Sequence, residues 1–267
     1  MSILAKIVSQ KRQDVIQTKL NTPISEVVKL PMFNRDCHSL AKRLKRPGQL
    51  GIIAEFKRKS PSRGQIIRPG VFLEDVVAGY EMAGVSGVSV LTDTPYFGGN
   101  LDDLHLARQS SAVPILRKDF IIDEYQLFEA KAHGADVILL IAACLLPADL
   151  RALAARAKSL GLDVLMEVHD EHELETCLNQ YIDMVGVNNR NLKTFDVSLE
   201  TSLELSEQIP PEFVKVAESG IHTPDDYLTL RKAGYEGFLI GQQFMETDAP
   251  DKACQNYLGT LAGLVGK

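Results

Sequence analysis

Several apolar segments of this chain end in charged or amide side chains. The segments are IIAEFK (Ile52–Lys57), PILRKDF (Pro114–Phe120), VLMEVH (Val164–His169), MVGVNNR (Met184–Arg190) and VKVAES (Val214–Ser219). An apolar run of this kind is typical of a parallel strand that is covered on both faces. Charged groups at the end of such a strand are costly unless they meet in a polar pocket. The pattern therefore predicts one active site, built from the ends of several parallel strands.

The alternation of side chains along a strand predicts which of these groups face the same way. Arg117 and Asp119 should point to the opposite side of their strand from Lys118. One pocket would thus receive two ammonium groups, two carboxylates and an amide–guanidinium pair. The sets that share a face are Glu55 with Lys57 and Ile53, Lys118 with Leu116 and Phe120, Glu167 with His169 and Leu165, and Asn188 with Arg190.

Each of these groups also has a purely structural interpretation. Glu55 and Lys57 could form an ion pair that only closes the end of a barrel. Lys118 could be held by Glu167 or Glu55 without touching a ligand, and Glu167 could serve only as its orienting partner. A single histidine at a strand end, such as His169, is typical of a structural residue. Arg117 and Asp119 would form an outer-face pair or contact a helix.

Composition limits the class of protein. With 267 residues, of which 45% are hydrophobic, the chain is long enough for one α/β barrel of about 250 residues. Its net charge of −6 argues against a general nucleic-acid surface. No apolar run reaches the roughly 18 residues of a membrane span, and the first residues lack a signal-peptide pattern. We expect a soluble cytoplasmic protein whose dispersed cysteines stay reduced: Cys37, Cys144, Cys177 and Cys254.

Strands and helices alternate along the chain, which favours βαβ units and a parallel sheet. Helical stretches are predicted over Leu73–Ala83, Asp123–Ala132, Pro147–Leu160 and Pro224–Ala233, and each is closed by a glycine that suits a helix C-terminus. Eight units indicate a (β/α)8 TIM barrel. A doubly wound open sheet is the rival, but its GxGxxG sequence and the Walker sequence are both absent. The strands are expected to begin near Gly51, Val85, Val113, Asp136, Asp163, Met184, Phe213 and Gly237.

Residues 1–47 precede the first strand and read as a helical N-terminal extension of a single domain, 1–267, whose barrel spans 48–267. One amphipathic helix is predicted from the spacing of Ile3, Leu4, Ile7, Val8, Val15 and Ile16, and a second over Ser39–Lys45. The extension could be a packed lid that merely closes the barrel, or it could help to cover the substrate.

The last two strand ends suit a phosphate group. Phosphate sites on such barrels commonly use the loops after strands seven and eight together with a helix N-terminus. Ser219 and Gly220 follow the seventh predicted strand, and Gly241 follows the eighth. These residues permit a close approach of the backbone to an anion, and Lys57 could supply charge. A plain tight turn is the alternative.

The chain resembles the indole-3-glycerol phosphate synthases of tryptophan biosynthesis, in their monofunctional form. The resemblance runs in the same order over nearly the whole chain, and EFKRKSPS and LRKDFI are its most specific parts. It is carried by IIAEFKRKSPSRG (Ile52–Gly64), VSVLTDTPYFGGN (Val88–Asn100), ILRKDFIIDEYQ (Ile115–Gln126), MEVHDEHEL (Met166–Leu174), GVNNRNL (Gly186–Leu192) and VAESGI (Val216–Ile221).

The resemblance implies a carboxy-lyase that uses no cofactor and no metal. The substrate would be 1-(2-carboxyphenylamino)-1-deoxyribulose 5-phosphate, and the products indole-3-glycerol phosphate, CO2 and water. Matched positions imply that Lys118 is the general acid and Glu167 the general base, with Lys57, Glu55 and Asn188 assisting. Binding roles fall to Arg190, Glu218, Ser219, Gly220, Gly241, Ser60, Phe97, Phe120, Leu139 and Ile141. The expected partner is this small phosphorylated molecule, with no nucleic acid or membrane. The chain is expected to act as a monomer, a weak oligomer being the alternative.

One position departs from the family pattern, since Gln242 follows Gly241 where a small hydroxyl residue or Glu is common. A backbone contact to phosphate would survive this change, whereas a hydroxyl contact would not. Lys59 and Ser60–Ser62 are expected to form a mobile loop over the pocket. Two rival functions share the fold: a Schiff-base aldolase with Lys118 as nucleophile, and a non-catalytic barrel that binds a phosphorylated metabolite.

Overall fold

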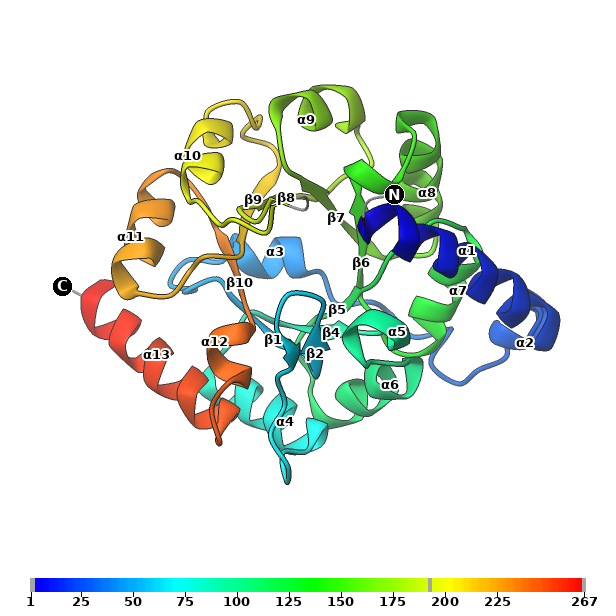
Figure 1. The fold of residues 1–267 in the computed structure, drawn as a ribbon, viewed down its shortest axis with the longest axis horizontal. Coiled ribbons are helices and arrows are strands. Elements are labelled where there is room, and N and C mark those ends of the chain that lie inside the picture. Colours follow the sequence, from blue (N-terminus) through cyan, green and yellow to red (C-terminus); the bar gives the residue numbers. More distant parts are fainter. Residues whose placement is uncertain (1–2, 192–193, 266–267) are drawn as a thin grey trace.

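A closed barrel of parallel strands forms the centre of the molecule (Figure 1). The computed structural model describes residues 3–191 and 194–265. Within these residues, the strands of the barrel follow one another around the ring in the order β1-β10-β9-β8-β7-β6-β5-β4. Their bounds are β1 (Ile52–Phe56), β4 (Gly87–Leu91), β5 (Ile115–Lys118), β6 (Val137–Ile141), β7 (Asp163–Val168), β8 (Met184–Asn188), β9 (Val214–Glu218) and β10 (Gly237–Ile240).

Helices surround the barrel and connect its strands (Figure 1). The TIM-barrel prediction is confirmed, and each predicted strand lies within three residues of its expected start. The helices outside the N-terminal extension are α4 (Leu73–Ala83), α5 (Thr94–Phe97), α6 (Leu101–Ser110), α7 (Tyr125–Ala132), the 3-10 turn η1 (Ala142–Cys144), α8 (Pro147–Ser159), α9 (Glu171–Cys177), α10 (Glu200–Ser206), α11 (Pro224–Lys232), α12 (Gln242–Met245) and α13 (Pro250–Val265).

Local sequence signals explain where these helices begin and end. Asn100 and Asp103 form a capping box at the start of α6, and Thr223 and Asp226 form another at the start of α11. Gly84 ends α4 with φ of +90°, a left-handed conformation that a residue without Cβ adopts at little cost. The helix ends predicted from such residues are therefore confirmed.

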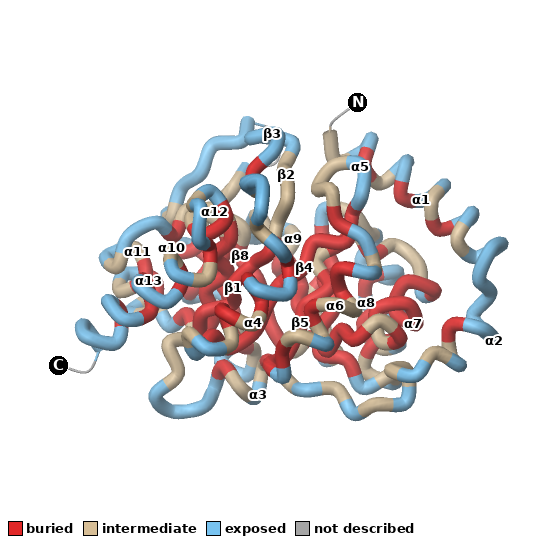
Figure 2. The backbone as a smooth tube through the Cα atoms, turned by 90° about the horizontal axis from the view of Figure 1, so that it is seen from below, coloured by how far each residue is buried: buried red, intermediate tan, exposed pale blue. Residues whose placement is uncertain are grey.

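Apolar side chains pack in two layers, one inside the barrel and one between the barrel and its helices. The interior layer contains Ile53, Leu116, Leu139, Leu165 and Leu239, whereas their neighbours along each strand face outward toward the helices. Figure 2 shows the buried residues concentrated on the barrel and on the inner sides of the surrounding helices. The predicted parity of the strand residues is thereby confirmed.

The N-terminal extension contributes three helices: α1 (Ile3–Asn21), α2 (Ile24–Val27) and α3 (Leu40–Leu44). Leu40 and Leu44 of α3 pack into the interior layer and close the end of the barrel where the strands begin. Figure 2 shows α3 at the opposite end of the barrel from the start of α1. The two helices predicted in this region are confirmed, and the short α2 was not predicted.

A small hairpin, β2 (Lys59–Ser60) with β3 (Gly64–Gln65), rises from the loop after β1 (Figure 2). The predicted loop over the pocket is thus a two-stranded hairpin, and its mobility stays a prediction. In the part of the chain that the structure describes, every helix is too short or too polar to cross a membrane.

Candidate active site

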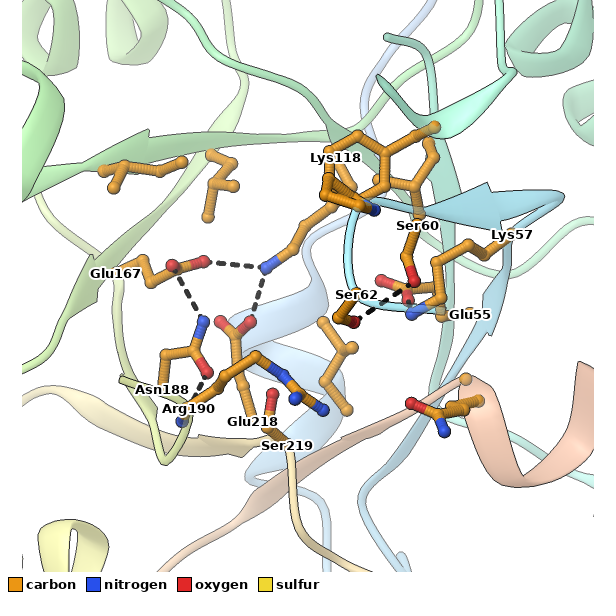
Figure 3. Close-up of a pocket in the computed structure, with 18 of the residues that line it drawn as sticks. Glu55, Lys57, Ser60, Ser62, Lys118, Glu167, Asn188, Arg190, Glu218 and Ser219 are labelled. Atoms are coloured by element: carbon orange, nitrogen blue, oxygen red, sulfur yellow. Dashed lines mark hydrogen bonds and ion pairs between the residues drawn. The ribbon is translucent and has the colours of Figure 1, made fainter. Parts of the chain in front are cut away.

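A cavity of about 210 Å³ opens at the carboxyl ends of the barrel strands. Each of the candidate site residues predicted from the sequence lines it (Figure 3). In chain order these are Glu55, Lys57, Ser60, Phe97, Lys118, Phe120, Leu139, Ile141, Glu167, Asn188, Arg190, Glu218, Ser219, Gly220 and Gly241. The parallel barrel explains this convergence, because it brings the carboxyl ends of its strands to one face.

Lys118 lies at the centre of the polar part of the pocket. Its Nζ is 2.8 Å from Glu167 Oε2 and also donates to Glu218 Oε2. Lys118, Glu167 and Glu218 belong to β5, β7 and β9, which alternate around the barrel with Glu55 on β1. Alternate strands contribute side chains to one interior layer of such a barrel. The same geometry therefore sets one ammonium group among three carboxylates.

Glu55 and Lys57 form a second ion pair on the same rim, with 2.7 Å between Lys57 Nζ and Glu55 Oε1. Ser89 donates to the other oxygen of Glu55 at 3.3 Å. Gly241 packs directly against this carboxylate, since a Cβ at position 241 would lie 2.7 Å from Glu55 Oε1. The glycine predicted to admit a phosphate is thus also required for the placement of Glu55.

Asn188 and Arg190 continue the polar wall beyond Glu167 (Figure 3). Asn188 Nδ2 donates to Glu167 Oε1 at 3.0 Å, and its Oδ1 accepts from the backbone of Arg190. The Arg190 guanidinium donates to the carbonyl of Phe195 at 3.2 Å. Leu192, the last residue of the GVNNRNL motif, lies outside the described residues.

Apolar side chains line the opposite part of the pocket. The rings of Phe97 and Phe120 lie 6.1 Å apart in a tilted arrangement, and Leu139 and Ile141 lie beside them. Ile3, Leu4 and Ile7 of α1 complete this wall. A flat aromatic group would find its apolar contacts here, while anionic or hydroxyl groups would face the polar rim.

The loop after β9 exposes backbone in an unusual conformation. Ser219 and Gly220 both have positive φ, +65° and +78°, and only glycine adopts this region without strain. Asn189 holds the loop, because its Nδ2 donates to the carbonyl of Ser219 at 3.1 Å. A strained non-glycine residue in a pocket is a common mark of a functional site. Ser219, Gly220 and Gly241 all line the cavity, and their binding of a phosphate stays a prediction.

The sequence matches one protein family over almost its whole length. A family model described as indole-3-glycerol phosphate synthase matches residues 4–257. The chain belongs to the indole-3-glycerol phosphate synthase family. It is 46% identical to the indole-3-glycerol phosphate synthase of Bacteroides thetaiotaomicron over 266 residues, covering 97% of this chain and 98% of that protein. It is 42% identical to that of Polaromonas naphthalenivorans over 260 residues, covering 96% and 98%. The resemblance to this family is confirmed, and so is the expectation of a decarboxylating lyase.

Solved structures of lower identity share the fold. A thiamine phosphate pyrophosphorylase from Pyrococcus furiosus superposes with a TM-score of 0.60 at 17% identity, covering 85% of this chain and 99% of that one. A structure described as native KDPGal gives 0.58 at 14% identity, covering 87% and 98%. At these identities the similarity supports the barrel architecture alone.

In this member of the synthase family, the electrostatics of the pocket favour a charged Lys118. Burial lowers the pKa of its ammonium group, but Glu167, Glu218 and Glu55 outweigh burial and raise that pKa above its usual value. Burial likewise raises the pKa of Glu167, while Lys118 and His169 bring it below the usual range. At neutral pH the pair is therefore an ammonium and a carboxylate.

Glu218 behaves differently from Glu167, although both contact Lys118. Burial and the neighbouring charges of Glu167 and Glu55 raise the pKa of Glu218 to about 7, against the opposing effect of Lys118. Its Oε1 is buried without a hydrogen-bond partner. One lysine cannot fully compensate two carboxylates, so the more isolated of them holds a proton more readily.

Three features of the site were not predicted. Gly186 lies in the middle of β8, and a Cβ there would meet Glu218 Oε1 at 2.5 Å. A glycine inside a strand marks such a close approach and could have been used as a signal. Lys11 of α1 is buried and pairs with Asp93 and Asp119, at 2.9 and 2.8 Å, directly beneath the pocket wall. His222 and Gln243 also line the cavity, whereas Ser62, which lines it too, belongs to the loop that was predicted to lie over the pocket.

Arg117 lies on the outer face of β5, as predicted, whereas Asp119 follows the end of the strand and also lines the cavity. Arg117 Nη2 is 3.0 Å from Asp119, and its Nη1 reaches Glu129 of α7 at 3.3 Å.

Gln242, the residue that departs from the family pattern, donates a hydrogen bond from its side-chain amide to Glu246 at 2.8 Å. Within the described residues, no cluster of three histidine, cysteine or acidic side chains has the arrangement of a metal site.

Proposed function

We propose that the chain closes the indole ring of indole-3-glycerol phosphate in tryptophan biosynthesis. It would convert 1-(2-carboxyphenylamino)-1-deoxyribulose 5-phosphate into indole-3-glycerol phosphate, CO2 and water. The observation that carries this proposal is Lys118 held between Glu167 and Glu218, in a pocket with one apolar and one polar wall. Membership of the family supplies the substrate class.

Lys118 acts as the general acid in this proposal. As the ring carbon that bears the carboxylate attacks the ketose carbonyl, Lys118 would protonate the developing alkoxide. The raised pKa of Lys118 supports this role, because the proton is present throughout the neutral range. General acid help of this kind typically contributes 10²–10⁴-fold.

Glu167 acts as the general base after CO2 has left. It would take the proton that must be lost when water is eliminated and the indole forms. Its lowered pKa supports a carboxylate that is ready to accept. Asn188 would hold the reacting hydroxyl near Glu167. Lys57 would bind the anionic groups of the substrate and share in acid catalysis, while Glu55 would orient Lys57 and Lys118.

Substrate binding supplies the remaining catalysis, since the flexible substrate must be folded so that its ring reaches its carbonyl carbon. The anthranilate ring would lie among Phe97, Phe120, Leu139 and Ile141. Arg190 and Ser60 would hold the carboxylate region, and Glu218 would line the centre. Ser219, Gly220 and Gly241 would hold the phosphate through their backbone, at the end of the pocket where α12 begins.

The Schiff-base aldolase alternative requires a neutral lysine. A lysine nucleophile needs a lowered pKa, whereas three carboxylates raise the pKa of Lys118. Borohydride treatment in the presence of a ketose phosphate would distinguish the two functions. A covalent adduct on Lys118 would overturn the general-acid assignment, and we expect none.

The organisation of the whole protein is part of the same proposal. We propose one domain, 1–267, in which 1–47 is an N-terminal extension of the barrel 48–267. A monomer in the cytoplasm, with no nucleic-acid or membrane partner, is the state expected. The four cysteines are free thiols in the structure, which is compatible with a reducing compartment.

The fluorescence of indole-3-glycerol phosphate provides the direct test. Purified protein should convert the carboxyphenylamino-deoxyribulose phosphate to a fluorescent indole product with release of one CO2 per turnover. Activity should be equal with and without EDTA. Binding of the substrate without turnover would favour the non-catalytic barrel, and loss of activity in EDTA would contradict the metal-free scheme.

A further inference from the structure

His169 lies behind Glu167, on the side of the carboxylate that Lys118 does not occupy. Its Nε2 is 3.4 Å from Glu167 Oε1, whereas Lys118 contacts Oε2. The side chain of His169 is only 13% exposed, and Nε2 is buried without a well-aligned hydrogen bond. Catalytic contacts are often long in the free protein and tighten when substrate binds.

The end of β7 and the start of α9 hold the imidazole in place. Glu173 Oε2 accepts the backbone N–H of His169 at 2.8 Å and lies 3.1 Å from its Nδ1. Glu173 is itself fixed in the first turn of α9, where its backbone N–H donates to the N-cap Asp170 at 2.9 Å. The carboxylate of Glu173 thus orients His169.

The two oxygens of Glu167 have different sets of partners. Oε2 faces Lys118, while Oε1 accepts from Asn188 at 3.0 Å and faces His169. Asn188 is neutral, so His169 is the partner of Oε1 that can carry a positive charge. Cys144 of η1 also lies near Glu167 and Glu173, and burial raises the pKa of its thiol to about 12, so it stays uncharged.

The proposed reaction makes this second cation useful. When Lys118 gives its proton to the substrate, Glu167 loses the positive charge beside it while Glu55 and Glu218 remain nearby. A buried carboxylate without a nearby cation tends to take up a proton. A protonated Glu167 could no longer act as a base. The charge of a histidine that takes no part in the acid step is unchanged at that moment.

We propose that His169, anchored by Glu173, is a positioning residue that fixes Glu167 and keeps its carboxylate ionised after Lys118 has given up its proton. The inference rests on the proposed roles of Lys118 and Glu167. This role requires a positively charged imidazole, and the surroundings of His169 in the free protein favour one. Burial lowers the pKa of His169, but Glu167 and Glu173 outweigh burial and raise that pKa to about 10.

Replacement of His169 by glutamine removes the charge and keeps an N–H donor at about the same reach. In His169→Gln, kcat should fall roughly 10–100-fold with KM changed less than about threefold, because the effect falls on the transition state. The acidic limb of the kcat–pH profile should move to higher pH by about one unit, since Glu167 loses a nearby cation. The matched control is His172→Gln on α9, an exposed side chain that should leave both quantities unchanged.

Glu173→Gln provides the second arm, since it leaves the imidazole but removes its anionic partner. The pKa of His169 should fall toward its ordinary value of about 6.5. The variant should therefore keep most of its activity near pH 6 and lose it as pH rises, a new alkaline limb that a merely structural role of Glu173 would not produce. Unchanged kcat and pH profiles in both variants would overturn the proposal.

A titration of the wild-type protein covers the case in which the variants fold poorly. With histidine labelled at its imidazole carbons, NMR should show His169 protonated from pH 6 to beyond pH 8. A neutral imidazole at pH 7.5 would overturn the inference. Failure of the proposed function can be distinguished from failure of this inference. In the first case the wild-type protein would form no indole-3-glycerol phosphate.

Discussion

The charge state of Lys118 is set by its neighbouring residues rather than by its burial. Burial alone would favour a neutral amine, yet Glu167, Glu218 and Glu55 reverse that tendency and keep the group protonated. The same ammonium group is therefore unsuited to nucleophilic attack and well suited to giving a proton to an alkoxide.

Lys118→Ala should consequently lower kcat by about 10²–10⁴-fold while KM changes little, since an acid acts mainly in the transition state. Steady-state kinetics with the fluorescent product would measure both constants. Lys59→Ala, on the hairpin where the side chain donates to the carbonyl of Pro95 at 2.9 Å, is the matched lysine control. Nearly full turnover in Lys118→Ala would place the acid elsewhere, with Lys57 the next candidate.

Glu218 makes the stability of the protein depend on pH in a defined window. Its pKa of about 7 in the folded protein lies above the 4.5 of an ordinary glutamate, so between these values the folded protein binds the proton more readily than the unfolded chain. The free energy of unfolding should therefore fall as pH rises from about 4.5 to about 7, by up to about 3 kcal/mol from this group.

Glu218→Gln should remove this part of the pH dependence, because glutamine does not titrate. Urea unfolding of the wild type and the variant at pH 5 and pH 7.5 would measure it. The variant should gain stability relative to the wild type on going to pH 7.5. Parallel pH dependences for the two proteins would show that Glu218 is ionised throughout the window.

At the scale of elements, α1 is tied to the barrel by one buried lysine. Lys11 sits on α1 and pairs with Asp93 and Asp119, which flank the pocket-lining segments that carry Phe97 and Phe120. Removing one partner of a buried ion pair leaves uncompensated charge and typically costs 3–5 kcal/mol. The docking of α1 should therefore be sensitive to the loss of Lys11.

Lys11→Met should release α1 and raise KM, because Ile3, Leu4 and Ile7 of the same helix line the pocket. Hydrogen exchange of the α1 amides would report the release, and steady-state kinetics the change in KM. Lys6→Met, an exposed position one turn earlier, should change neither. Unaltered exchange in Lys11→Met would mean that the apolar contacts of α1 and its Lys19–Asp123 ion pair suffice to hold the helix.

The lack of a side chain at Gly186 in β8 leaves space for the carboxylate of Glu218. A Cβ at Gly186 would meet Glu218 Oε1 at 2.5 Å, so alanine there should displace the carboxylate that contacts Lys118. Gly186→Ala should lower kcat by roughly 10–100-fold, the effect expected of a displacement of about 1 Å. Gly259→Ala on α13, where a Cβ would meet nothing within 4 Å, is the control that should keep full activity. Equal activities would show that Glu218 can shift without consequence.

At the scale of the whole molecule, the pattern of the sequence was enough to predict the barrel and the convergence of the site. Alternation along a strand placed Lys118 inside and Arg117 outside, and both placements hold in the structure. The interior position of Lys118 followed from local geometry, which depends on two neighbouring residues and not on distant contacts.

Long-range contacts could not be predicted in this way. Helical spacing identified α1, but it did not reveal that Lys11 would be buried or that Ile16 would be 56% exposed. The partners of Lys11 are distant in the sequence, since Asp93 follows β4 and Asp119 follows β5. The unequal roles of Glu167 and Glu218 likewise depend on how three carboxylates share one lysine. The β2–β3 hairpin was missed because two-residue strands leave no periodic signal.

The central claim is that Lys118 and Glu167 act together on one sugar chain held between an apolar wall and a phosphate-binding loop. A crystal structure with bound indole-3-glycerol phosphate tests it most directly. We expect the indole among Phe97, Phe120, Leu139 and Ile141, the phosphate on the backbone of Ser219, Gly220 and Gly241, and the Nζ of Lys118 within about 3–4 Å of the product, directly or through one water. Product bound away from Lys118 and Glu167, or with its phosphate at the opposite end of the pocket, would contradict the claim.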